Sequence, residues 1–429
     1  MKVRALVLGL VCLFTSAGSA FAVEPAEWNV LFFLNGKNNL QHEMQEFLLK
    51  NLYAMSDVNK GRNLPLHLPR NVNILVEYGT IAKDCNPNDR ADHDLDLCRT
   101  GVKRFRMIKG ADQVAGRDSA FQYLGKEDMG DANALVDFAA WSRKFPARKT
   151  VLYIFDHGSN YRGRADDGLF SFDEETGNSM SPREVADGFR KMASVLGRPI
   201  ELFVTDMCLV GSAEALGALD GSLRFYVASR ESVSGYSINI IDILRVLEKF
   251  PGINSKRWAY QIVLQANSYS TRTDFSAFAI DNMQNFEIAL AELVDSIRRA
   301  PDADRIRFQT HFLKECRFMD IGAESSFEFR DVLGCLYSLP GMKERPEYRN
   351  LQHAYYQVLF TNSNDIRSSG MSIWGGDNRS ASASAESLKQ YRTLRFDERS
   401  HWSDLIEVLG AGRRTDAGFR SGAHGRRHR

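Results

Sequence analysis

The chain alternates short apolar runs with longer stretches of helical spacing, a pattern typical of α/β proteins. Runs rich in Val, Ile, Leu and Phe predict buried strands at residues 28–34, 71–78, 102–108, 151–155, 200–205 and 224–229. Between them, apolar spacing predicts helices over residues 41–55, around Leu135 to Trp141, and after Ser181, which we expect to be an N-cap. We therefore predict a mainly parallel sheet sandwiched by helices.

The second half of the chain is less regular. Helices are expected at about 240–250, 256–270, 283–299 and 346–360, and short strands at 275–280 and 370–375. We interpret residues 23–235 as the main α/β domain and residues 236–410 as additional α/β elements packed on it. Residues 411–429 are rich in Arg and lack apolar periodicity, which predicts a disordered tail.

Two of the predicted strands end on ionisable residues. The run VLYIF is followed within three residues by His157 and Gly158, and the run IELFVT is followed by Asp206 and Cys208. In an open parallel sheet, ligands bind beyond the carboxyl ends of the strands. Because one crossover joins these two strands, we expect His157 and Cys208 to face each other across one crevice.

A cysteine beside a histidine favours nucleophilic catalysis, because the imidazole promotes formation of the reactive thiolate. We expect Cys208 to begin a helix that runs to about Leu219, whose N-terminal partial charge favours an anion. The backbone N–H groups of Gly158 and Cys208 would form an oxyanion hole. The alternative interpretation of each residue is structural, since an isolated His is usually hydrogen-bonded and an isolated Cys usually packed in a core.

The N-terminus has the features of a secretory signal peptide over residues 1–22. MKVR is positively charged, ALVLGLVCLF is too short to span a bilayer, and Ala20-Phe21-Ala22 is a cleavage signal. No other long apolar run follows, so we expect a secreted or periplasmic protein without a membrane span.

Export changes how the cysteines are interpreted. The cysteines after residue 22 are Cys85, Cys98, Cys208, Cys316 and Cys335. An odd number in an oxidising compartment leaves at least one thiol unpaired. The simplest pairs are Cys85 with Cys98 and Cys316 with Cys335, which would leave Cys208 as the free thiol.

Composition and charge add few constraints. The chain is 44% hydrophobic and 25% charged with a net charge of +1, which is typical of a globular protein and gives no reason to expect a nucleic-acid partner. Carboxylates alternate at Asp92, Asp94 and Asp96 and could bind calcium, but the glycine and closing Glu of an EF-hand are missing. We favour a solvated loop closed by a disulfide, with no cofactor required, and we expect Asp173-Glu174-Glu175 to lie on the surface.

Several motifs together resemble the clostripain family of cysteine peptidases, which are relatives of caspases, legumains and gingipains. DHGS (156–159) resembles the family's histidine motif, and TDMCLVGSAE (205–214) resembles its nucleophile motif. Supporting matches are WNVLFFLNGKNNL (28–40), the segment 127–147, FSAFAID (275–281) and GMSIW (370–374). The resemblance extends over nearly the whole chain after residue 22.

The resemblance implies a caspase-like sheet in which His157 and Cys208 form the catalytic dyad of an endopeptidase that cleaves after Arg or Lys. Asp206 would select that residue of the substrate, although Asp206 could instead cap the helix expected near Cys208. Family members often mature by cleavage between the His and Cys strands, and the loop from about Asn160 to Ser181 contains Arg162 and Arg164.

The sequence departs from the family pattern at two places. Asn160-Tyr161 replaces the usual Gly-Trp, and Lys37 replaces the usual acid before Asn-Asn-Leu. The predicted function is a secreted cysteine endopeptidase acting on proteins or peptides that contain Arg or Lys. Two alternatives stay open: a catalytically silent secreted binding protein on the same scaffold, and an amidase or transpeptidase that uses the same dyad.

Overall fold

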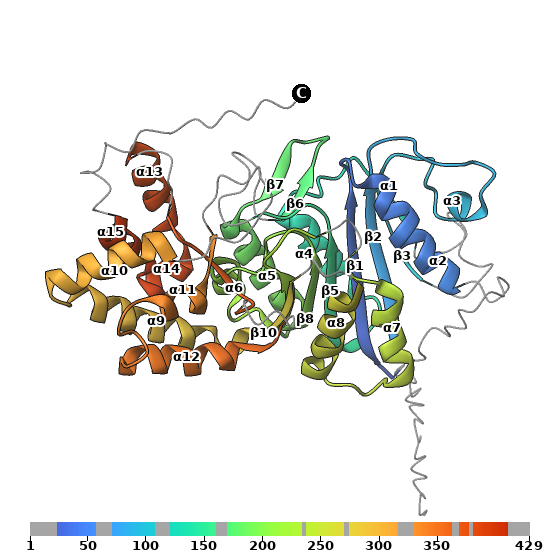
Figure 1. Ribbon diagram of the computed structural model, residues 1–429. Helices are drawn as coiled ribbons and strands as arrows, with labels where there is room; N and C mark the ends of the chain where they lie inside the picture. The colour runs from blue at the N-terminus through green and yellow to red at the C-terminus, as the bar shows by residue number, and fades with distance from the viewer. Residues whose placement is uncertain are drawn as a thin grey trace, which may run out of the picture.

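The fold is organised around one mixed sheet (Figure 1). The computed structural model describes residues 24–56, 71–107, 121–159, 170–233, 237–269, 274–315, 329–362, 369–376 and 381–410. Within these residues, nine strands join in the order β12-β10-β9-β8-β5-β1-β2-β3-β4. The central strands are parallel: β1 (Ala26–Gly36), β2 (Val72–Thr80), β5 (Ala147–Phe155), β8 (Ile200–Asp206) and β9 (Leu223–Ser229). The outer strands pair antiparallel: β3 (Gly101–Arg106), β4 (Gln122–Gly125), β10 (Phe275–Ala279) and β12 (Leu359–Thr361).

Helices cover both faces of the sheet, because its central strands carry apolar side chains on both sides. One face packs against α4 (Ala132–Ser142), α5 (Pro182–Leu196) and α6 (Ala213–Leu219). The other face packs against α1 (Gln41–Glu43), the π-helical segment η1 (Met44–Leu49), α2 (Lys50–Ser56), α7 (Ile240–Lys249) and α8 (Ser255–Tyr269). Alternation along β1 sends Leu31 into the first core and Phe32 into the second, both fully buried. The predicted sheet sandwiched by helices is therefore confirmed.

Local signals set the start of α5 as the sequence predicts. The Ser181 hydroxyl accepts a hydrogen bond from the Glu184 N–H at 3.3 Å, and the Glu184 carboxylate accepts one from the Ser181 N–H at 2.9 Å. This reciprocal pair is a capping box, and it satisfies two backbone donors that the helix cannot satisfy itself.

The chain after β10 contributes mainly helices, which gather at the α6 end of the molecule, away from β2 and β3 (Figure 1). They are η3 (Ile280–Asn282), α9 (Met283–Arg298), α10 (Asp302–Glu315), α11 (Val332–Ser338), α12 (Pro346–Val358), α13 (Ala381–Tyr391), α14 (Arg395–Ser400) and α15 (Trp402–Gly410). Two small antiparallel sheets pair β6 (Phe170–Asp173) with β7 (Asn178–Met180), and β11 (Phe329–Asp331) with β13 (Ser372–Trp374).

The large sheet continues across the boundary expected at residue 235. Strand β10 pairs with β9, and β12 pairs with β10, so two strands from the second half complete the sheet of the first. The residues on the two sides of that boundary therefore share one hydrogen-bonded sheet.

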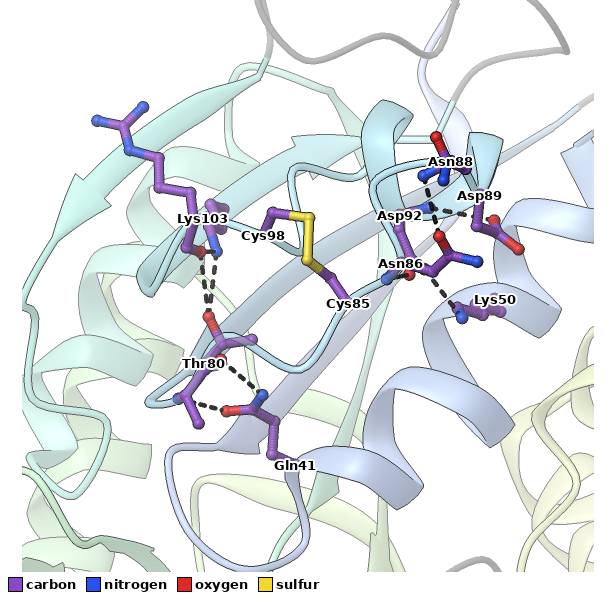
Figure 2. Close-up of a disulfide and its surroundings, with 12 residues drawn as sticks. Gln41, Lys50, Thr80, Cys85, Asn86, Asn88, Asp89, Asp92, Cys98 and Lys103 are labelled. Carbon is purple, nitrogen blue, oxygen red and sulfur yellow. Dashed lines mark hydrogen bonds and ion pairs between the residues drawn. A yellow bond between two sulfur atoms is a disulfide. The ribbon is translucent and has the colours of Figure 1, made fainter.

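The acidic loop after β2 is closed by a disulfide between Cys85 and Cys98, whose Cα atoms are 5.3 Å apart (Figure 2). This confirms the first predicted pair. The expected solvated state is wrong for two of the aspartates, because Asp92 and Asp94 are 2% and 4% exposed. The buried carboxylate of Asp92 forms an ion pair with Lys50 at 2.9 Å, and that of Asp94 accepts a hydrogen bond from the Tyr53 hydroxyl.

This arrangement does not form a metal site. The short helix α3 (Arg90–Asp94) starts at Asp89, whose carboxylate accepts hydrogen bonds from the N–H groups of Ala91 and Asp92. Asp96 lies beyond the helix with a φ of 54°. Among the residues described above, no group of three His, Cys, Asp or Glu side chains could hold a metal ion. These carboxylates therefore provide no calcium site. A calcium requirement of the protein stays a prediction.

Some sequence predictions fall outside the described residues. These are the signal peptide, the loop residues Arg162 and Arg164, Cys316 and the tail after residue 410. Cys335 is disulfide-bonded, and its pairing with Cys316 stays a prediction. In the described ranges, no helix is both long and apolar enough to cross a membrane.

Replacing both Cys85 and Cys98 by Ser should lower the free energy of unfolding by about 3 kcal/mol, because the disulfide closes a short loop and restricts the unfolded chain. Urea titration of the double variant and the parent protein, both under oxidising conditions, measures the difference. Equal free energies of unfolding would show that the loop is held by its hydrogen bonds alone.

Candidate active site

The register of two neighbouring strands brings the predicted catalytic residues together. Strand β5 pairs with β8 so that Phe155 lies opposite Asp206. His157 follows Phe155 by two residues and Cys208 follows Asp206 by two residues, so both lie at the same level beyond the carboxyl edge of the sheet. Both side chains are half-buried. Both residues therefore follow the carboxyl ends of neighbouring parallel strands, as the sequence predicts; that they face each other across a crevice stays a prediction.

The loops that carry these residues are in direct contact at Gly158. A Cβ atom built on Gly158 would lie 2.6 Å from the Cys208 carbonyl oxygen and 2.7 Å from the Cβ of Met207. No ordinary side chain fits at that separation, so the glycine allows the two loops to pack closely. This contact, rather than access for substrate, is the role of Gly158 that the geometry shows directly.

The predicted helix start at Cys208 is wrong. Helix α6 begins at Ala213, and its N-cap is Ser212, whose hydroxyl accepts a hydrogen bond from the Ala215 N–H at 3.3 Å. Cys208 instead lies in a loop five residues before the helix. The helix partial charge therefore does not act on its thiol, since that effect is confined to the first turn.

Backbone hydrogen bonds to the following strand hold this loop in place. The Leu209 N–H donates to the Glu231 carbonyl at 3.1 Å, and the Gly211 N–H donates to the Ser229 carbonyl at 2.8 Å. Leu209 adopts a φ of +64°, a left-handed conformation that costs free energy for a residue with a Cβ. The hydrogen bonds of the loop therefore maintain a strained turn directly after Cys208.

An ion-pair cluster attaches the same region to the second half of the chain. Arg230, at the end of β9, is 8% exposed. Its guanidinium pairs with Asp331 at 2.9 Å and with Asp274. A second link comes from the Ser372 N–H, which donates to the Gly211 carbonyl at 3.1 Å. The loop that carries Cys208 is therefore supported by residues distant in sequence.

Cys208 is the free cysteine among the residues described. Burial raises the pKa of its thiol, and the Val233 N–H, which donates to Sγ at 3.3 Å, opposes that shift. The Asp206 charge raises the pKa further. The surroundings therefore favour the neutral thiol, so a nearby base is required to generate the thiolate.

His157 is the predicted base, and its imidazole is held by the turn after β1. Its Nε2 atom lies 2.7 Å from the Oδ1 atom of Asn39, in the turn after β1. The turn reaches this position because β1 is the neighbour of β5 in the sheet and ends at the same edge.

The residue before the histidine is the centre of a buried polar network. The Asp156 carboxylate is 3% exposed. It accepts hydrogen bonds from the amide of Asn35 at 2.6 Å, from the amide of Asn38 at 2.6 Å, and from the His157 N–H at 2.5 Å. Burial raises the pKa of Asp156 well above its usual range, and these donors oppose the shift. The network fixes the backbone at His157.

Lys37, one of the two departures from the expected pattern, is a buried cation with a structural role. Its Nζ atom lies 2.7 Å from Asp173 and 3.0 Å from Glu175, and it donates to the Glu127 carbonyl at 2.7 Å. The expected surface position of Asp173 is therefore wrong, because its side chain is fully buried against this lysine. Lys37 ties the turn after β1 to the β6–β7 hairpin.

Asp206 is buried at the end of β8, with 2% exposure. Its carboxylate accepts hydrogen bonds from the N–H groups of Ser237 at 3.3 Å and Ile238 at 3.1 Å, and from the Tyr153 hydroxyl at 3.3 Å. Burial raises the pKa of Asp206 to about 7, opposed by these donors. The alternative that Asp206 caps a helix is wrong, because Ser212 holds that position.

Sequence reasoning missed two groups at this site, Asp156 and Asn39. The available signals were the position of Asp156 directly beside the histidine and the cluster of asparagines that follows the first strand. The predicted partner of Gly158 in an oxyanion hole, the Cys208 N–H, lies in the loop against which Gly158 packs.

Comparison with known proteins bears on the fold and the family of the chain. The sequence profile of the clostripain family, peptidase family C11, matches residues 35–319. No curated protein matches the chain. Among solved structures, a secreted C11 cysteine protease from Bacteroides thetaiotaomicron, in complex with an irreversible peptide inhibitor, superposes with a TM-score of 0.60 at 15% identity. That match covers 88% of this chain and 99% of the other.

A second solved structure has the same overall fold. An inactive zymogen C11 protease from Parabacteroides distasonis superposes with a TM-score of 0.57 at 12% identity, covering 88% of this chain and 99% of the other. The identities are low, so these superpositions establish the fold, and the profile match over most of the sequence establishes the family. The chain belongs to the clostripain family of cysteine peptidases.

Proposed function

We propose that this cysteine peptidase cleaves peptide bonds after Arg or Lys, with Cys208 as the nucleophile and His157 as its proton acceptor. The observation that carries the proposal is the pairing of Phe155 with Asp206. His157 and Cys208 each follow one of these paired residues by two positions, so both lie at one level beyond the sheet edge. The contact of Gly158 with the Cys208 carbonyl supports it, because it holds the two loops together.

In the proposed reaction, His157 takes the proton from Cys208 as Sγ bonds to the carbonyl carbon of the substrate. The oxyanion that forms would accept hydrogen bonds from the backbone N–H groups of Gly158 and Cys208. As the C–N bond breaks, His157 returns the proton to the leaving amine, and a thioester remains on Cys208. His157 then accepts a proton from water, whose oxygen bonds to the thioester carbon. The C–S bond breaks, the acid is released, and Sγ of Cys208 recovers the proton from His157. No cofactor takes part in these steps.

We assign export to an oxidising compartment, secreted or periplasmic. The disulfide between Cys85 and Cys98 supports this, because such bonds persist where thiols are not kept reduced. The features of residues 1–22 as a signal peptide point the same way.

We place the selectivity for a basic residue at Asp206. Its buried carboxylate ends strand β8 two residues before the proposed nucleophile, close enough in the chain for a substrate side chain beside Cys208 to reach it. Three hydrogen bonds occupy part of its acceptor capacity, and a carboxylate offers about four lone-pair sites. A guanidinium that reaches it would form a charge-assisted pair in a site with little water.

Self-processing between the His and Cys strands is also part of the proposal. The segment after Ser159 contains Arg162 and Arg164, which match the proposed selectivity. One structural relative is described as an inactive zymogen. The pieces of a chain cut there would stay associated, because β5 and β8 lie on opposite sides of the cut and pair in the sheet.

An Arg-based chloromethyl ketone should modify Cys208 and no other residue, because only that thiol is expected to be activated by His157. Cys208→Ala should fold normally and lose activity by roughly 10⁴-fold or more, and His157→Ala should do the same without additive loss in the double variant. Mass spectrometry locates the label, and a thermal melt checks folding. Label on another residue, or turnover by folded Cys208→Ala, would reject the mechanism.

Selectivity for Arg over an uncharged residue should depend on pH through Asp206. Below a pKa of about 7 the carboxyl is protonated and neutral, so the ratio of kcat/KM for the two substrates should fall about tenfold per pH unit. Titration of the dyad changes kcat/KM for both substrates by the same factor, so it does not affect the ratio. In Asp206→Asn the ratio should be low and independent of pH. A flat ratio in the parent protein between pH 5.5 and 8.5 would contradict the assignment.

Asp206→Asn should also be less stable. An amide offers one acceptor oxygen where the carboxylate uses two, so one buried donor loses its partner at a cost of about 1–3 kcal/mol. The loss should grow smaller as pH rises from about 4 to 7. In that window Asp206 ionises in the unfolded parent chain, while its raised pKa keeps it protonated in the folded protein, so the parent becomes less stable.

Self-processing predicts a nick between Ser159 and Phe170 in purified active protein and an intact chain in Cys208→Ala. N-terminal sequencing of the fragments identifies the bond, which should follow Arg162 or Arg164. Replacing both arginines by Gln should leave the chain intact. A fully active parent protein that stays a single chain would show that no processing is needed.

A further inference from the structure

The turn after β1 places an amide side chain on the proposed catalytic histidine. The Oδ1 atom of Asn39 lies 2.7 Å from Nε2 of His157, although the two residues are 118 positions apart in the chain. An amide oxygen can only accept a hydrogen bond. In this contact Nε2 therefore carries the proton, and the lone pair of the neutral imidazole is on Nδ1.

A second contact runs beside the first. Asn38 donates to the Asp156 carboxylate at 2.6 Å, and the neighbouring residues Asn39 and His157 form the contact just described. Two consecutive residues of the turn thus bind two consecutive residues of the loop after β5. Asn38 also donates to the Phe172 carbonyl at 2.8 Å, which fixes the backbone from which Asn39 projects.

The turn is anchored at both ends. On one side, Lys37 is buried in its ion pair with Asp173. On the other side, the carboxamide oxygen of Gln41 accepts hydrogen bonds from the N–H groups of Ile81 at 2.8 Å and Ala82 at 2.9 Å, beside Thr80 (Figure 2). Asn39 itself is exposed, whereas Lys37, Asn38 and Gln41 are buried and held. An exposed side chain on a fixed turn can orient a partner without contributing much to stability.

We propose that Asn39 is a positioning residue of the active site, which fixes the Nε2–H tautomer of His157 and directs Nδ1 to the Cys208 thiol. The inference rests on the proposed dyad and adds a third group to it. When His157 takes the proton from Cys208, Nδ1 becomes protonated and Nε2 keeps its hydrogen. The bond to Asn39 is then retained and becomes charge-assisted, so the imidazolium is stabilised without any movement of the side chain.

The test compares Asn39→Ala with Asn39→Asp in the full-length protein. Asn39→Ala should lower kcat about tenfold with KM and Tm unchanged, the loss expected for one neutral hydrogen bond. Asn39→Asp should keep most of the activity, because a carboxylate also accepts from Nε2. The limb of the kcat/KM profile that belongs to His157 should move up by about one pH unit, since an adjacent negative charge favours the imidazolium.

Asn88→Ala and Asn88→Asp are the matched controls. Asn88 is exposed in the disulfide-closed loop, and the same two substitutions there should leave kcat and the pH profile unchanged. Asp156, Cys208 and Asp206 are the same in all four variants, so a shift confined to Asn39→Asp comes from the new carboxylate. A purely structural role of Asn39 would change Tm and would not move the profile.

A substrate-independent readout separates this inference from the proposed function. The rate at which iodoacetamide alkylates Cys208, measured against pH, reports the coupling of the thiol to His157. The profile should shift in Asn39→Asp and in His157→Ala. If Cys208→Ala stays active, the peptidase mechanism fails. A different result overturns this inference alone. In that case Cys208→Ala is inactive, but Asn39→Ala has the kcat of the parent protein and both Asn39 variants keep its alkylation profile.

Discussion

Parallel hydrogen bonding between β5 and β8 aligns Phe155 with Asp206, and the geometry of the site follows from that alignment. Residues at equal distances beyond the two strand ends emerge side by side, and Gly158 lets their loops approach to contact. Strand β1, on the other side of β5, delivers its own turn to the same edge. Three adjacent parallel strands thus supply a thiol, an imidazole and an amide oxygen from segments far apart in the chain.

The parts of the structure that depend on local pattern could be predicted from the sequence. Apolar runs located the central strands, and Ser181 with Pro182 located the start of α5, because burial and capping leave signals within a few residues. The start of α6 was predicted five residues early. The hydrogen bonds that keep the Cys208 loop out of the helix come from Ser229 and Glu231, and no local pattern reports them.

Long-range pairing of charges was equally invisible in the sequence. Lys37, Asp173 and Asp92 look like surface residues, since charged side chains are rarely buried. Each is buried because an opposite charge from another element meets it. The contact between Asn39 and His157 belongs to the same class, since it exists only after β1 and β5 pair. The sequence could predict the proposed dyad from strand ends, but not the residues that hold its histidine.

The continuity of the sheet beyond β9 limits how the chain can be divided. A fragment that ended near residue 235 would keep β9 but lose β10, and would expose a row of unpaired backbone groups that can recruit other chains. The same cut would remove Asp274 and Asp331, so Arg230 would lose both carboxylates. An isolated N-terminal half would therefore aggregate rather than fold into a smaller enzyme.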